Sequence, residues 1–203
     1  MFTGIVQEIG TVRHTGPNAS GLRLEVASSL VAPELPIDAS VNVAGACLTV
    51  VEKDTHGFVV DVVAETLKRT TLVRAIRGTR VNLESAATPT TALGGHLVQG
   101  HVDATTKLMA RREEGGGAAR LRFAVPRGLA RYIVIKGFIA LDGVSLTIAG
   151  LGKTYFEVAL IPHTAERTTL GALAPGDLVN VETDVVAKYV ERLLEPVSSQ
   201  HGR

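Results

Sequence analysis

An internal repeat constrains this chain more than any other feature of its sequence. Gly45-Ala46-Cys47-Leu48-Thr49-Val50 is matched 98 residues later by Gly143-Val144-Ser145-Leu146-Thr147-Ile148. Residues 58–60, 66–72 and 78–84 are matched in the same order by residues 156–158, 164–170 and 176–182. Matched blocks that keep one order and one spacing predict two copies of a small domain in tandem.

Each copy contains short β-branched stretches between turn-forming residues. In the first copy they predict strands at 4–12, 22–26, 40–43, 47–53, 57–63 and 79–83, with a short helix at 65–72. Six short strands in half of a 203-residue chain favour a closed barrel, because closure leaves no exposed strand edge. Turn residues predict hairpin loops at 16–21 and 113–117, and a linker between the copies at 86–95.

The C-terminal segment has a different pattern. Asp184–Glu195 places apolar residues on one helical stripe, which predicts an amphipathic helix. This stripe is buried either against its own barrel or against its counterparts in an oligomer. The expected fold is therefore all-β, with two similar six-stranded Greek-key β-barrels in tandem (1–92 and 93–183) and a C-terminal amphipathic α-helix with a tail (184–203).

Composition and charge argue against several classes of protein. Hydrophobic residues make up 45% of the chain and charged residues 20%, which is typical of a globular protein. A net charge of +1 gives no basic field for nucleic acid, and no apolar run approaches the roughly 18 residues of a membrane helix. The first residues lack the basic region of a signal peptide. The single cysteine, Cys47, leaves no internal disulfide and no multi-cysteine zinc site, so we expect a cytoplasmic protein without a metal.

Cys47 and its repeat partner Ser145 are the first candidates for chemistry. Each precedes Leu-Thr in a predicted strand, so alternation places Cys47 with Thr49, and Ser145 with Thr147, on one face. A small polar pair at the same place in both copies predicts the wall of a pocket. The alternative for Cys47 is an inert, buried residue that behaves as a small hydrophobe.

Other candidates lie where the two copies differ. His101 stands where the first copy has Ile5, and it either makes two similar pockets unequal or is a partly exposed histidine at a barrel mouth. Lys136 and Asp142 also differ from their repeat partners. We expect them to form an acid–base pair near Ser145, with a surface ion pair as the alternative.

Together these residues resemble the riboflavin synthase family, over nearly the whole chain and in family order. The motifs that carry the resemblance are Met1–Val6, Cys47–Val50, Glu65–Thr71, Gly95–Asp103, Lys136–Ile139, Asp142–Thr147 and Ile161–Leu170. One departure is Ala44, where family members often carry Asn or another polar residue. No role is carried over to that position.

The resemblance implies an enzyme of the transferase class that needs no cofactor. Two molecules of 6,7-dimethyl-8-ribityllumazine react, one gives a four-carbon unit to the other, and the products are riboflavin and 5-amino-6-ribitylaminouracil. The resemblance further implies a homotrimer held by the C-terminal helices. Each active site is then expected between the N-terminal barrel of one subunit and the C-terminal barrel of another. Lumazine synthase is the further partner that it suggests.

The resemblance also implies two pockets that hold the ligand through backbone and small polar groups. The N-terminal pocket is expected to contain Gly4, Ile5, Val6, Ser40, Cys47, Leu48, Thr49, Asp61, Val62, Val63, Ala64, Glu65 and Thr66. The C-terminal pocket is expected to contain Gly100, His101, Val102, Lys136, Ser145, Leu146, Thr147, Ala159, Leu160, Ile161, Pro162, His163 and Thr164. The catalytic candidates are Ser40, Cys47, His101, Lys136, Asp142 and Ser145. Among them, His101 suits proton transfer, and Cys47, Ser145 or a water is the adding nucleophile.

Other functions remain open from the sequence. A lumazine-binding antenna protein would share the fold and bind the chromophore without converting it. A tandem-barrel interaction module and a flavin-dependent reductase barrel are disfavoured by the lack of a basic face and of a dinucleotide-binding fingerprint.

Overall fold

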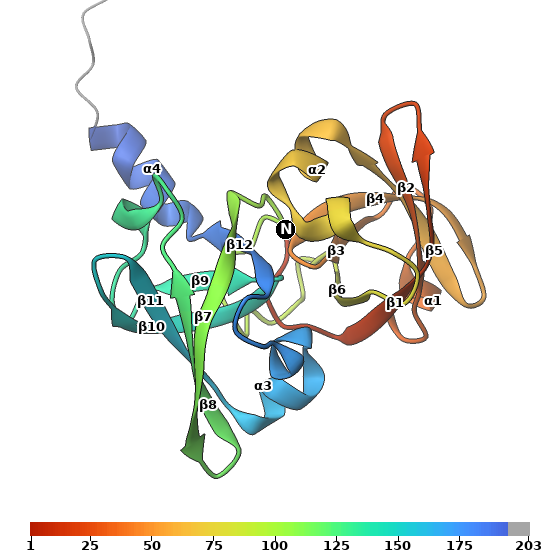
Figure 1. Ribbon diagram of the computed structural model, residues 1–203. Helices are drawn as coiled ribbons and strands as arrows, with labels where there is room; N and C mark the ends of the chain where they lie inside the picture. The colour runs from red at the N-terminus through yellow and green to blue at the C-terminus, as the bar shows by residue number, and fades with distance from the viewer. Residues whose placement is uncertain (195–203) are drawn as a thin grey trace, which may run out of the picture.

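The computed structural model describes residues 1–194, and its two halves share one architecture (Figure 1). The first half contains β1 (Glu8–Asn18), β2 (Gly21–Ala27), β3 (Ser40–Val43), β4 (Ala46–Asp54), β5 (Gly57–Val63) and β6 (Arg80–Ser85). The second contains β7 (Ala104–Gly115), β8 (Ala118–Ala124), β9 (Phe138–Leu141), β10 (Val144–Leu151), β11 (Tyr155–Leu160) and β12 (Leu178–Thr183). The helices are α1 (Val31–Glu34), α2 (Ala64–Arg69), α3 (Pro162–Arg167) and α4 (Val185–Leu194), with short 3-10 turns at Thr71–Arg74, Ala130–Tyr132 and Thr169–Ala172.

Each half closes into a six-stranded antiparallel barrel. The strand order of the first barrel is β1-β2-β5-β4-β3-β6, and β7 to β12 follow the equivalent order in the second. The step from β2 to β3 skips two strands, which gives the Greek-key connection. Inward-facing Val, Leu, Ile and Phe side chains form a separate core in each barrel. The predicted all-β fold, with tandem barrels and a C-terminal helix, is confirmed.

The first hairpin differs from the prediction at both ends. β1 begins at Glu8 rather than Gly4 and continues through Asn18. Only Ala19 and Ser20 therefore separate β1 from β2, where the sequence predicts a longer loop. Gly16 and Pro17 lie within the strand ladder, because a strand near its hairpin end tolerates turn-forming residues.

Two segments cross between the barrels, one from each copy. We call residues 2–6 the first crossing segment and residues 98–102 the second crossing segment. The carbonyl oxygen of Gly4 accepts a hydrogen bond from the N–H of Ser145 in β10 (2.8 Å). The carbonyl oxygen of Gly100 accepts one from the N–H of Cys47 in β4 (2.8 Å). Each crossing segment therefore hydrogen-bonds to a strand of the other copy's barrel.

Buried asparagines join the two barrels in both directions. Asn180 accepts a hydrogen bond from the N–H of Thr71 (2.7 Å) and donates one to the carbonyl oxygen of Ala44 (2.7 Å). Its repeat partner Asn82 makes the two equivalent bonds to the second barrel, at 2.8 and 3.0 Å. Because the bonds are reciprocal, an approximate two-fold axis relates the barrels.

The terminal helix α4 projects from the edge of the second barrel (Figure 1). Its first residue, Val185, is buried, but the rest of its apolar stripe is uncovered: Tyr189 is 65% exposed and Leu193 is 82% exposed. The predicted helix is confirmed for residues 185–194, and Glu195 with the tail to 203 lies outside the described residues. No helix within residues 1–194 is long and apolar enough to span a membrane.

Candidate functional site

The small polar residues of the repeat lie on the outer faces of the barrels. In β4, Cys47 is partly buried and Thr49 is exposed, while Leu48 points into the core. Ser145 and Thr147 occupy the same positions on β10. The alternation predicted from the sequence is therefore confirmed, and Cys47 is not enclosed in the hydrophobic core.

A pocket of about 170 Å³ lies beside Cys47. It is lined by the start of β4, by α2 and by the second crossing segment, with the residues Ala46, Cys47, Glu65, Thr66, Arg69, Thr70, Gly100, His101 and Val102. Glu65 accepts a hydrogen bond from Arg69 (2.5 Å), and this bond holds the pKa of Glu65 below its usual range. The pocket thus combines a thiol, an imidazole, hydroxyls and a carboxylate–guanidinium pair.

The crossing segments correct the predicted composition of both pockets. The sequence assigns Gly100–Val102 to the C-terminal pocket, but the structure places them against Cys47 in the N-terminal one. Conversely, Gly4–Val6 lie against the second barrel, where Val6 packs on the core. The reason is that β4 and β5 pair only from Val50 onward, so the edge of β4 at Cys47 is free to bind another extended segment.

On the second barrel, Ser145 contacts a buried histidine. Its Oγ lies 2.6 Å from Nδ1 of His96, and the His96 ring stacks on Phe138 with the ring centroids 5.0 Å apart. Burial lowers the pKa of His96, although the negative charge of Asp184 opposes this shift. A neutral imidazole beside a hydroxyl can accept the hydroxyl proton, so this pair can activate Ser145.

Sequence reasoning missed His96 as a site residue. Comparison of the copies could not find it, because the crossing segments align Gly4 with Gly100 and His96 then falls before Met1. The available signal was its place in the Gly95-His96-Leu97 motif of the family resemblance.

Lys136 and Asp142 do not form the predicted acid–base pair. They lie at opposite ends of β9, and no salt bridge among residues 1–194 joins them. Lys136 is exposed, whereas Asp142 is buried and accepts a hydrogen bond from the N–H of Asn180 (2.7 Å). Burial raises the pKa of Asp142 to about 7. The prediction is wrong because a whole strand separates two residues that are close in sequence.

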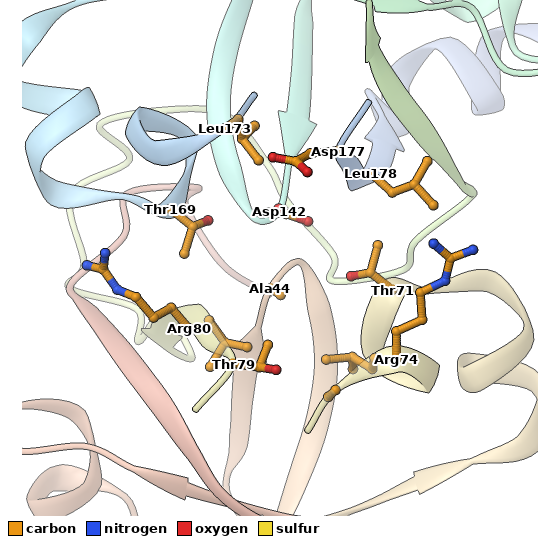
Figure 2. Close-up of a pocket in the computed structure, with 13 residues that line it drawn as sticks. Ala44, Thr71, Arg74, Thr79, Arg80, Asp142, Thr169, Leu173, Asp177 and Leu178 are labelled. Atoms are coloured by element: carbon orange, nitrogen blue, oxygen red, sulfur yellow. The ribbon is translucent and has the colours of Figure 1, made fainter. Parts of the chain in front are cut away.

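Asp142 instead lines a cavity of about 290 Å³ between the barrels (Figure 2). The repeat partners Thr71 and Thr169 lie on either side of Ala44 and Asp142 there. The full lining is Ala44, Thr71, Leu72, Arg74, Ala75, Thr79, Arg80, Val81, Asp142, Thr169, Leu173, Asp177 and Leu178. Neither Cys47 nor Ser145 belongs to it, so this cavity is separate from the outer faces that carry the candidate chemistry.

Strand alternation divides the remaining predicted binding residues. Exposed or partly buried are Ile5, Ser40, Asp61, Val63, Ala64, Ala159, Ile161, Pro162, His163 and Thr164. Buried in the cores are Leu48, Val62, Leu146 and Leu160, so only their backbone can meet a ligand. Oδ1 of Asp61 is buried without a hydrogen-bond partner, and a ligand hydroxyl could satisfy it. Within residues 1–194, no cluster of three His, Cys, Asp or Glu side chains is placed to hold a metal ion.

Comparisons with known proteins show which family the chain resembles. A sequence model of the lumazine binding domain matches residues 3–86 and 99–184. The chain is 48% identical to a riboflavin synthase of Mycobacterium bovis over 198 residues, which cover 96% of this chain and 98% of the relative. It is 38% identical to a riboflavin synthase of Bacillus subtilis over 194 residues, 96% and 90% of the two chains. A crystal structure of LumP complexed with riboflavin superposes with a TM-score of 0.83 at 25% identity, covering 90% of this chain and 99% of LumP.

Proposed function

The chain belongs to the riboflavin synthase family, and on this premise we propose that it converts two molecules of 6,7-dimethyl-8-ribityllumazine to riboflavin and 5-amino-6-ribitylaminouracil. One lumazine transfers a four-carbon unit to the other. Two lumazines together contain the atoms of both products, so the reaction consumes no co-substrate. The observation that carries the proposal is the repeat of one outward-facing pair, Cys47 with Thr49 and Ser145 with Thr147.

The outer faces offer polar groups that suit a ribityl chain. A ribityl chain carries several hydroxyl groups, each of which can donate and accept hydrogen bonds. The unpaired Oδ1 of Asp61 lies on β5, and Thr66 lines the pocket beside Cys47. We assign the ribityl chain of one lumazine to this region, and that of the other to the equivalent face at Ser145 and Thr164.

Within one chain, the two lumazine sites face away from each other. α2, which borders the pocket of Cys47, and its repeat partner α3 lie on opposite sides of the two barrels (Figure 1). Two lumazines bound to a single chain therefore would not meet. We place the reaction between the N-terminal barrel of one subunit and the C-terminal barrel of another, where both pockets supply ligands at high effective concentration.

The uncovered face of α4 supports an oligomer that can build such junctions. Val186, Tyr189, Val190, Leu193 and Leu194 are all about half exposed or more, and α4 borders an apolar groove with Tyr132 and Val134. Contiguous exposed apolar surface of this kind usually marks an interface. We propose a homotrimer in which α4 packs against its counterparts.

The residues divide the chemistry between the two barrels. The reaction requires removal of a proton from the 7-methyl group of one lumazine and addition of a nucleophile to a ring carbon of the other. Ser145, activated by neutral His96, adds to that carbon or directs a water to it. His101, exposed beside Cys47, accepts the methyl proton.

Incubation of the purified protein with the lumazine tests the proposal directly. Riboflavin absorbance should appear, with two lumazines consumed for each riboflavin formed. Lumazine that binds without conversion would contradict the proposal and favour an antenna protein.

A further inference from the structure

Each barrel ends in a buried glutamate that forms no salt bridge. Glu84 in β6 and Glu182 in β12 are repeat partners, and they are only 4% and 3% exposed. No salt bridge within residues 1–194 includes either carboxylate. Burial raises the pKa of both groups. A buried carboxylate is costly unless hydrogen-bond donors surround it, so its donors must be accounted for.

The donors come from the crossing segments. Glu182 accepts hydrogen bonds from the backbone N–H groups of Gln99 (2.7 Å), Gly100 (2.9 Å) and His101 (3.0 Å). Glu84 accepts them from the N–H and hydroxyl of Thr3 (both 2.7 Å) and from the N–H of Gly4 (3.0 Å). Each glutamate therefore holds the crossing segment at the point where that segment leaves its own barrel.

The same segments form part of the pockets of the opposite barrel. Gly100 accepts the N–H of Cys47, and His101 lines the pocket beside it. The fit is tight: Gly100 has a φ of +78°, and a Cβ added there would lie 2.6 Å from Cβ of Cys47. A Cβ added at Gly4 would likewise lie 2.5 Å from Cβ of Ser145. A small displacement of either segment is therefore transmitted to the reactive residue that it contacts.

We propose that Glu84 and Glu182 are positioning residues, each for the pocket of the opposite barrel. Glu182, in the C-terminal barrel, sets the backbone around Cys47 and His101. Glu84, in the N-terminal barrel, sets the backbone around Ser145. Only the identity of the ligand in these pockets rests on the proposed function; the positioning itself concerns the protein alone.

Glutamine at these positions is the sharpest probe. Glu182→Gln keeps the size of the side chain but replaces one acceptor oxygen by an NH₂ group, which faces a backbone N–H instead of accepting from it. The second crossing segment should then move away from Cys47. Glu84→Gln is the matched control for this pocket, because it makes the same chemical change at the repeat position.

Cys47 is the only cysteine of the chain and reports on its own pocket. We expect Glu182→Gln to change the rate of alkylation of Cys47 by iodoacetamide by about threefold or more, because thiol reactivity follows local environment and access. Glu84→Gln should leave this rate within about twofold, because Glu84 binds Thr3 and Gly4, and the carbonyl of Gly4 contacts Ser145 rather than Cys47. Equal effects of the two variants, or no effect of either, would overturn the proposal.

A reciprocal reporter tests the other pocket. In a chain carrying Cys47→Ser and Ser145→Cys, Glu84→Gln should change the alkylation rate and Glu182→Gln should not. Circular dichroism establishes that each variant folds. If a Gln variant does not fold, Glu84→Asp or Glu182→Asp replaces it, since Asp keeps the charge but withdraws the carboxylate from its donors. An unchanged rate at the opposite pocket in the Asp variant would also overturn the proposal.

The alkylation assay contains no lumazine and measures no turnover. A failure of the unsubstituted protein to form riboflavin would therefore contradict the proposed function and leave this inference standing. Loss of the reciprocal pattern of alkylation rates would contradict this inference and leave the proposed function standing.

Discussion

At the scale of single residues, Asp142 makes stability depend on pH. Its pKa is raised to about 7 in the folded chain, against an ordinary value of 3.8. Between these values the folded state keeps a proton that the unfolded state releases, so stability decreases as pH rises. The full difference is on the order of 4 kcal/mol, and it is complete above pH 7.

Asp142→Asn should remove this contribution. The amide oxygen can still accept the N–H of Asn180, and the side chain no longer ionises. We expect the variant to be more stable than the unsubstituted protein at pH 8 by a few kcal/mol and about equally stable at pH 4. Urea unfolding at the two pH values measures the difference; a gap of equal size at both would rule out ionisation as its cause.

The Ser145–His96 contact makes a second prediction at this scale. Burial lowers the pKa of His96 from its ordinary value, so the imidazole is neutral at pH 7 and becomes charged only in more acidic solution. Riboflavin formation should therefore decline on the acid side as His96 gains a proton. Ser145→Ala should reduce kcat by about 10²–10⁴-fold, and adding His96→Asn should cost little more, because the pair acts as a unit. A Ser145→Ala variant with full kcat would remove this pair from the mechanism.

Among the elements, the crossing segments depend on glycine. Gly100→Ala combines a positive φ with a close approach to Cys47, so we expect it to destabilise the fold by about 2–4 kcal/mol. Gly128 has a similar φ of +85°, but nothing lies within 4 Å of an added Cβ. Gly128→Ala should therefore cost only about 1 kcal/mol and serves as the control. Equal losses in thermal unfolding would show that the contact with Cys47 is unimportant.

The strands were predictable because they depend on local pattern. Alternation of side chains put Leu48 inward and Cys47 outward, and the repeat carried that assignment to Ser145. The start of β1 was not predictable in this way. Gly4–Val6 are extended whether they pair with their own barrel or with the other, and only tertiary contacts decide between the two.

The same limit applies to the site. The two crossing segments hold equivalent places in the repeat, so comparison of the copies cannot tell which one borders Cys47. The comparison also aligns Glu84 with Glu182. It does not reveal that both carboxylates are buried and accept hydrogen bonds from the crossing segments. Nearness in sequence suggested the Lys136–Asp142 pair, but the extended strand β9 lies between the two residues and holds them apart.

For the whole molecule, the exposed face of α4 predicts the size of the particle. Leu193→Glu places a charge on a side chain that is 82% exposed in the single chain, so the chain should still fold while its association is lost. Light scattering should give three copies of the 21.4 kDa chain for the unsubstituted protein and one for the variant. Val73→Glu, at an exposed apolar residue on a 3-10 turn of the first barrel, is the control and should remain trimeric. A trimer that survives Leu193→Glu would contradict this role of α4.

The central claim is that two lumazines meet across a junction between subunits. Thr49→Trp should block the N-terminal pocket and Thr147→Trp the C-terminal one, because both side chains are exposed on the outer strand faces. Each variant alone should be inactive. In trimers mixed from equal amounts of both, an intact N-terminal barrel of one variant meets an intact C-terminal barrel of the other at about a quarter of the junctions. Riboflavin formation should return to about that fraction, whereas mixed trimers that stay inactive would contradict a site shared between subunits.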